Sequence, residues 1–223
     1  IVGLAAIGVL PLLFLQGLRR SSEASVAAKP KLDVRAVLRR PKVAVPIVTA
    51  AVSQGVMVLL MVPTPIVMVA CGFDAATGAN VVGWHVVAMF APSFVTGFLI
   101  KKFGAPKIIY VGLALLAVAA LIAATGIALE NFYFALVVLG VGWNFGFIGS
   151  TSLLTDALAT DERASIQGIN DTAIALASAM AAFISGAVVA GFGWTVLVLA
   201  SLPIIGVTAL VLFRNGSREC VQN

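Results

Sequence analysis

Charged side chains are scarce in this chain. Only 10% of its 223 residues are Asp, Glu, Lys or Arg, and 61% are hydrophobic. A soluble domain carries about 25% charged residues. A folded chain with so few charges lacks the polar surface that a water-soluble protein needs, so we expect lipid to be the solvent for most of it.

Histidine and cysteine are also nearly absent, which limits the chemistry. His85 is the only histidine and Cys71 and Cys220 are the only cysteines. We expect the two cysteines on opposite faces of a membrane, where they cannot pair. Because His85 has no second His or Cys nearby in sequence, we predict no metal site and no cofactor. No nucleophile, phosphate-binding or paired-carboxylate motif is present, so we predict that the protein is not an enzyme.

Long apolar runs are the main positive signal. A helix of about 20 apolar residues crosses the hydrocarbon core of a bilayer, and its backbone groups must be hydrogen-bonded within the protein. The sequence therefore predicts an all-α, polytopic transmembrane helix bundle. The run that begins at Ile1 has no basic region before it, and we expect it to be a helix of a longer protein rather than a signal peptide. The runs are 1–18, 43–70, 81–100, 108–127, 132–155, 164–190 and 194–213.

The basic residues occupy alternate connections between these runs. Eight lie in 19–42, three in 101–107, one in 156–163 and two in 214–223, which accounts for all 14. This pattern predicts that these segments, and the C-terminus, are cytoplasmic in a plasma membrane. A nucleic-acid-binding surface would not explain why basic residues skip every second connection.

Three local features refine this picture. Within 19–42, apolar residues at helical spacing in 32–40 fit either a short amphipathic helix on the inner leaflet or a flexible linker. We expect Thr160 or Asp161 to cap the helix that follows. Prolines within the apolar runs predict bends; they are Pro46, Pro63, Pro65, Pro92 and Pro203.

The connection after the run 81–100 resembles a known loop motif. Residues 97–107 read GFLIKKFGAPK, which is similar to the major facilitator superfamily pattern G-x-L-x-D-R-x-G-R-R. Gly97, Leu99, Lys102 and Gly104 match in register, whereas Lys101 stands where the family has Asp. The resemblance implies the second copy of this motif, between the eighth and ninth helices of a twelve-helix transporter.

This resemblance implies a domain layout and a function. Residues 1–18 would be the last helix of the N-terminal bundle, 19–42 the basic cytoplasmic central loop, 43–213 the C-terminal six-helix bundle and 214–223 a cytoplasmic tail. The implied protein is a bacterial permease that moves a small solute by alternating access, with protons as the expected coupling ion. Its partners would be the lipid bilayer and the N-terminal half.

By analogy with the family, runs 43–70 and 132–155 line the substrate cavity. Gln54 and Asn144 lie near the middle of these runs, and Trp143 is beside Asn144. Thr49 and Ser53 share one helix face. We predict these five residues as substrate-binding candidates. The alternative is an interhelical hydrogen bond of about 0.6 kcal/mol for each amide, and simple packing for Trp143.

The coupling candidates lie mainly on one helix face. Asp171 is about 10 Å into its run, measured from Ala164, and an intramembrane acid is a functional candidate by default. Gln167 and Asn170 precede it at helical spacing. His85 is a further proton-relay candidate. The alternatives are a structural polar cluster for the first three and an interfacial role for His85. We predict a conformational role for the loop motif residues Gly97, Lys101, Lys102 and Gly104.

Two other functions compete with transport. A raw count of seven apolar runs also fits a seven-helix receptor, although a retinal protein would need a lysine within a run and none is present. The second is a membrane enzyme or a non-catalytic assembly subunit. A cluster of polar groups at one membrane face would support that function, and none is visible.

Overall fold

The computed structural model describes residues 33–222, with side chains described through Asn215. The predicted helix 1–18 and most of the predicted loop 19–42 lie outside the described residues. The unit from Val34 onward is built from helices. These are α2 (Val34–Leu38), α3 (Pro41–Met61), α4 (Thr64–Ala70), α5 (Ala75–Phe90), α6 (Ser93–Phe103), α7 (Ala105–Ala124), α8 (Leu129–Ala157), α9 (Arg163–Phe192) and α10 (Trp194–Gln222).

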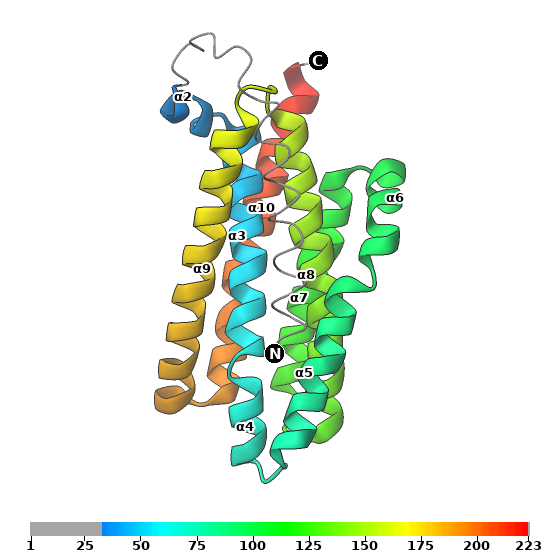
Figure 1. Cartoon of the computed structure of the whole chain (residues 1–223), viewed down its shortest axis with the longest axis vertical. Coiled ribbons are helices and arrows are strands. Elements are labelled where there is room, and N and C mark those ends of the chain that lie inside the picture. The colour runs from blue at the N-terminus through cyan, green and yellow to red at the C-terminus, as the bar shows by residue number, and fades with distance from the viewer. Residues whose placement is uncertain (1–32, 223) are drawn as a thin grey trace, which may run out of the picture. The chain divides into compact units, whose positions relative to one another are not determined.

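Six helical segments of the described chain are long and apolar enough to cross a membrane, which confirms the predicted all-α bundle. They run roughly side by side (Figure 1). The second begins at Ala75, earlier than the predicted 81, because the Asp74 side chain accepts a hydrogen bond from Thr77 N at 2.6 Å and caps α5. The segments are Pro41–Ala70, Ala75–Phe103, Ala105–Ala124, Leu129–Ala157, Arg163–Phe192 and Trp194–Asn215.

The prolines act in two ways. Pro46 and Pro203 stay inside α3 and α10. Pro63 separates α3 from α4, and Pro92 separates α5 from α6. Proline has no N–H and so interrupts the helical hydrogen bonds. At the second break, α6 is offset sideways from the axis of α5 (Figure 1).

Close backbone contact joins α7 to α8. A Cβ at Gly112 would overlap the backbone nitrogen of Gly146 and lie 2.9 Å from the Gly142 carbonyl oxygen. A Cβ at Gly142 would lie 2.9 Å from Leu116 N. Only glycine permits this approach, and small residues are the usual means of close helix packing in membranes. The pair Gly142 and Gly146 therefore forms a helix contact.

Helices α3 and α9 run parallel. Arg40 Nη1 lies 2.9 Å from Glu162 Oε1, and a Cβ at Gly55 would lie 3.7 Å from Ala177 Cβ. Both contacts join residues 122 positions apart in the chain. The first contact joins the entrance of α3 to the turn before α9.

The expected cap of α9 is wrong. Neither Thr160 nor Asp161 occupies the N-cap position; Glu162 does, and its side chain makes no capping bond to the helix. The Glu162 carboxylate instead accepts from Ala159 N at 3.1 Å and pairs with Arg40. A partner on another helix thus replaces the local cap. Within 33–40, the described part of the segment 32–40, the chain forms one short helix, α2, with Val37 buried.

Candidate functional site

Gln54 of α3 and Trp143 of α8 meet in the bundle. Trp143 Nε1 donates a hydrogen bond to Gln54 Oε1 at 2.7 Å. Trp143 stacks on Phe147, with ring centroids 4.8 Å apart and planes at 19°. Phe90, the last residue of α5, meets Trp143 edge-on at 6.1 Å. We call these four residues, Gln54, Phe90, Trp143 and Phe147, the aromatic wall.

The aromatic wall combines apolar ring faces with unused hydrogen-bonding capacity. Phe90 is 58% exposed, and Gln54 and Phe147 are partly exposed, whereas the Trp143 ring is buried beneath them. A side-chain amide carries two N–H donors, and no described residue accepts a hydrogen bond from those of Gln54. Such a surface can stack on a planar solute and hydrogen-bond its polar edge.

Thr49 and Ser53 share one helix face as predicted, but both are buried in the protein. The Thr49 hydroxyl donates to the Val45 carbonyl at 2.8 Å. The Ser53 hydroxyl faces Gly146 of α8, where a Cβ would lie 2.6 Å from Ser53 Oγ. The structure therefore places both side chains at helix contacts, apart from the open side of the aromatic wall.

Asn144 is fully engaged with protein groups. Its Nδ2 donates to the Met89 carbonyl and to Ser93 Oγ, both at 2.7 Å, and its Oδ1 lies 2.6 Å from Thr96 Oγ1. Because Met89 O can only accept, the amide orientation is fixed. The side chain is completely buried and joins α8 to the break between α5 and α6.

His85 is buried between α5 and α8. Its Nδ1 lies 2.7 Å from the Leu136 carbonyl, so Nδ1 carries the proton and Nε2 has a lone pair. Nε2 is buried and has no hydrogen-bond partner among the described residues. A Cβ at Gly140 would lie 2.8 Å from the His85 carbonyl oxygen, which explains why glycine stands there. Trp84, which precedes His85, is 56% exposed. Of these two residues, only Trp84 fits an interfacial position.

The polar face predicted on α9 is divided. Asp171 is exposed, whereas Asn170 is buried. Asn170 Oδ1 and Gln167 Oε1 are buried oxygens without a hydrogen-bond donor in the described chain. Buried polar groups are rarely left unpaired, so this turn of α9 contains two acceptors that lack a partner.

The loop motif forms the end of α6. Lys101 and Lys102 lie in its last turn, where positive charge suits the helix dipole. The turn itself is shorter than expected, because α6 continues to Phe103 and α7 begins at Ala105. Gly104 makes the whole connection with φ of 88°, a conformation that favours glycine. A Cβ at Gly97 would have no described atom within 4 Å, so nothing in this part of the chain packs on it.

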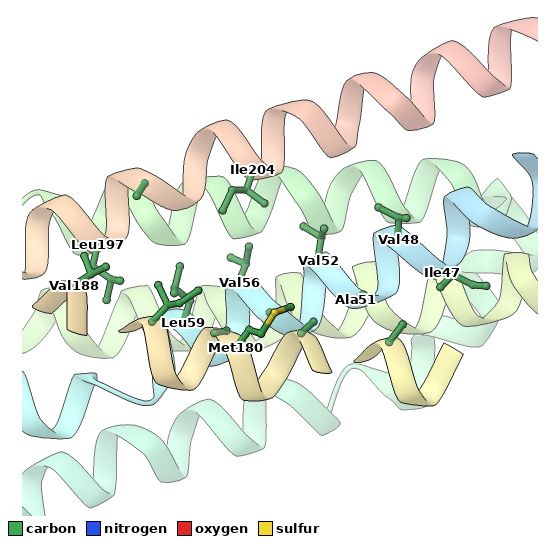
Figure 2. Close-up of a pocket in the computed structure, with 16 residues that line it drawn as sticks. Ile47, Val48, Ala51, Val52, Val56, Leu59, Met180, Val188, Leu197 and Ile204 are labelled. Atoms are coloured by element: carbon green, nitrogen blue, oxygen red, sulfur yellow. The ribbon is translucent and has the colours of Figure 1, made fainter. Parts of the chain in front are cut away.

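An apolar groove lies elsewhere, between α3, α9 and α10. Its volume is about 430 Å³, and Figure 2 shows aliphatic side chains and Met180 along its walls. None of its lining side chains has a hydrogen-bonding group, so it cannot orient a polar solute. We therefore assign the candidate solute site to the aromatic wall. The groove is lined by Ile47, Val48, Ala51, Val52, Gly55, Val56, Leu59, Ala173, Ala177, Met180, Ala181, Ile184, Val188, Leu197, Ala200 and Ile204.

Sequence reasoning missed Phe90, Phe147, Ser93 and Thr96. Phe147 follows Trp143 by four positions, a spacing that places two side chains on one helix face. Ser93 follows Pro92 directly and Thr96 lies four positions after it, beside a helix break that frees backbone groups. No three His, Cys, Asp or Glu side chains within residues 33–215 are grouped so that they could hold a metal ion.

Comparisons with known proteins agree with this architecture. The family model for the Major Facilitator Superfamily matches residues 47–219. The chain is 38% identical over 212 residues to the riboflavin transporter RfnT of Brucella anthropi. The aligned region covers 95% of this chain and 52% of RfnT.

Two uncharacterized MFS-type transporters of Bacillus subtilis also match. YdeG is 38% identical over 162 residues, covering 72% of this chain and 37% of YdeG. YddS is 39% identical over 147 residues, covering 65% of this chain and 34% of YddS. The chain thus spans about half the length of RfnT and about a third of the other two. Together with its six membrane-spanning helices, these matches show that the chain is a partial domain, like a C-terminal half, and that it belongs to the major facilitator superfamily.

Proposed function

We propose that this chain forms the C-terminal half of a secondary active transporter that moves a small solute across the plasma membrane by alternating access. In this proposal Gln54 and Trp143 bind the solute. The observation that carries it is the Gln54–Trp143 hydrogen bond of 2.7 Å, which joins α3 to α8 and leaves amide donors beside aromatic rings. These two helices line the cavity in the family resemblance.

The chemistry of the aromatic wall favours a planar heteroaromatic solute. The exposed Phe90 ring and the partly exposed Phe147 ring, which stacks on the buried Trp143, offer an apolar face, and the Gln54 amide offers donors to ring carbonyls or nitrogens. Riboflavin has this chemistry, and RfnT, a relative at 38% identity, is a riboflavin transporter. We therefore propose a flavin-like solute for this chain.

A second half is proposed as the partner. The exposed face of α9 carries small residues spaced alternately by four and three positions, a pattern that allows close approach of another helix. RfnT is about twice as long as this chain, which leaves room for such a half. The small residues are Gly168, Thr172, Ala175, Ala179 and Gly186, with Ala182 partly buried in the same row.

Asp171 is proposed as the proton-coupling group. It lies eight residues beyond Arg163, about 12 Å along α9, and an exposed carboxylate at that depth is costly in lipid. When protonated, its carboxyl has a proton to donate, and Gln167 Oε1, one helical turn away, is a buried acceptor without a donor. Protonation would therefore change the hydrogen bonding of this turn.

Transport in proteoliposomes tests the function and the coupling together. With the full-length protein we expect radiolabelled riboflavin to exchange across the membrane and to accumulate under an inward proton gradient. Asp171→Asn should retain exchange but lose accumulation. His85→Gln, which keeps a donor for Leu136 O, should retain both.

Three results would count against these proposals. Absence of riboflavin exchange above that of empty liposomes would reject the flavin-like solute. Normal proton-driven accumulation by Asp171→Asn would reject Asp171 as the coupling group, and loss of accumulation in His85→Gln alone would point to His85.

The proposed orientation places the loop after α6 in the cytoplasm. In a Cys71→Ser, Cys220→Ser background, we expect an impermeant maleimide to label Ala76→Cys in intact cells and Lys102→Cys only after permeabilisation. Both positions are exposed. The opposite labelling pattern would reverse the orientation.

A further inference from the structure

The break between α5 and α6 has a side-chain replacement for its lost helical hydrogen bonds. Pro92 has no N–H to give to the Ala88 carbonyl. The next carbonyl, that of Met89, receives a hydrogen bond from Asn144 Nδ2 at 2.7 Å. The second proton of the same amide reaches Ser93 Oγ at 2.7 Å, so Asn144 bridges the end of α5 and the start of α6.

Thr96 supplies the third contact and has a choice of acceptor. Its hydroxyl lies 2.6 Å from Asn144 Oδ1 and 2.8 Å from the Pro92 carbonyl. A hydroxyl has one proton, so it donates to one of these oxygens at a time. Donation to Pro92 leaves Asn144 Oδ1 without a donor, and donation to Asn144 ties α6 to α8.

Within residues 33–215, helix α6 buries few side chains against its neighbours. Thr96 is its one buried residue. Phe94 is 94% exposed and Phe98 is 64% exposed, and Gly97 has no described neighbour on its open side. Since side-chain burial fixes most helices, the hydrogen bonds of Asn144 take a large share of that role here.

Two consecutive residues of α8 connect the proposed solute site to the α5–α6 break. Trp143 belongs to the aromatic wall, and Asn144 contacts the break. Trp143 contacts Phe90 at 6.1 Å between ring centroids, and Phe90 is the last residue of α5. Asn144 contacts residues on both sides of Pro92. A solute that displaces Phe90 or Trp143 would therefore move the groups that hold α6.

We propose that Asn144 is a positioning residue that clamps the broken α5–α6 segment to α8 and transmits solute binding at the aromatic wall to the loop motif at the end of α6. The transmission step rests on the proposed function, whereas the clamp itself does not. A solute-driven change of the α6 position would move Lys101, Lys102 and Gly104 at the membrane surface.

Spin labels measure the clamp without any solute. In the full-length protein with Cys71, Cys220 and any cysteine outside this chain changed to Ser, labels at Phe98→Cys in α6 and Val118→Cys in α7 report the position of α6. We expect Asn144→Leu to broaden this distance distribution at least twofold. Thr96→Val and Ser93→Ala, which each remove one bond and disturb folding less, should broaden it by smaller amounts.

The matched control is Thr151→Val on the same helix. The Thr151 hydroxyl donates only to the Phe147 carbonyl within α8, at 2.9 Å. It should leave the distribution unchanged. Unchanged distributions in all three clamp variants would overturn the clamp.

Transport measurements then test the transmission. We expect Ser93→Ala and Thr96→Val to bind riboflavin within threefold of the native affinity but to transport it at least fivefold more slowly. If Ser93→Ala or Thr96→Val broadened the α6 distance distribution but transported riboflavin at the native rate, the proposed transmission would be wrong. If the native protein did not bind riboflavin, the proposed solute would be wrong. The distances measured without solute would still test the clamp.

Discussion

Two groups stand out among the polar residues of these helices. Gln54, Trp143 and Asn144 are paired across helices at 2.7 Å. Others keep a buried atom with no hydrogen-bond partner in the part of the chain that the structure describes, and these are Ser53, Ser150, His85, Gln167 and Asn170. In a bilayer core, water cannot supply the missing bond, so an unpaired buried group marks either a structural cost or a place where protons, solute or the second half arrive.

Asp74 gives a prediction at the residue scale. The hydrogen bond from Thr77 lowers the pKa of Asp74 below its ordinary value of 3.8. A lowered folded-state pKa means that the cap stabilises the protein above that ordinary pKa and that this stabilisation is lost as the pH falls through the folded pKa. We expect Asp74→Ala to lower the thermal melting temperature at pH 7, and the difference from the native protein to shrink below pH 3.8.

Asp74→Asn is the control for this prediction, because Asn is as good an N-cap as Asp but does not titrate. Asp74→Asn should melt near the native temperature at pH 7. The difference between the melting temperatures of Asp74→Asn and Asp74→Ala should not shrink at low pH. An Asp74→Ala deficit of the same size at all pH values would contradict the assigned cap.

Glycine contacts give a prediction at the element scale. A Cβ at Gly112 would overlap backbone atoms of α8, whereas a Cβ at Gly55 would meet Ala177 Cβ at an ordinary 3.7 Å. We expect Gly112→Ala to destabilise the bundle by about 1–3 kcal/mol. Gly55→Ala should be neutral or stabilising by up to about 1 kcal/mol, because alanine has the higher helix propensity.

Thermal unfolding in detergent compares the two glycine variants directly. Equal melting temperatures for Gly112→Ala and Gly55→Ala would show that α7 and α8 are not in backbone contact at Gly112.

The row of small residues on α9 gives a second prediction at this scale. Ala179 lies in the exposed row and its neighbour Met180 lines the apolar groove. We expect Ala179→Phe to reduce transport by the full-length protein at least tenfold, because a large ring would hold the two halves apart. Met180→Phe should retain most of the transport. Similar activity in both variants would argue that the second half packs on another face.

Across the whole bundle, the sequence predicted where the helices lie in the chain better than which side of each helix faces which neighbour. Hydropathy found the six described spans because bilayer thickness sets their length, and residues 97–104 located the connection between α6 and α7. Depth along a helix placed Asn144 and Gln54 near the centre. Which neighbour each side chain meets depends on helix rotation and on the break at Pro92, which periodicity does not reveal.

The same limit applies to the candidate site. The pairing of Gln54 with Trp143 needs two helix positions 89 residues apart to face each other. Spacing alone predicts that Thr49 and Ser53 share a helix face. It does not reveal that this face packs against protein. Asp171 and Asn170 differ by one position, and one is exposed while the other is buried. Long-range packing therefore decides which polar residues can reach a solute.

In the proposed transporter the aromatic wall, and not the apolar groove, receives the solute. The most direct test is the dissociation constant of riboflavin for two variants of the full-length protein, Trp143→Leu and Ala200→Phe, the second of which fills the groove. We predict at least tenfold weaker binding for Trp143→Leu and native affinity for Ala200→Phe. Native affinity in Trp143→Leu together with weakened binding in Ala200→Phe would show that the solute binds in the apolar groove instead.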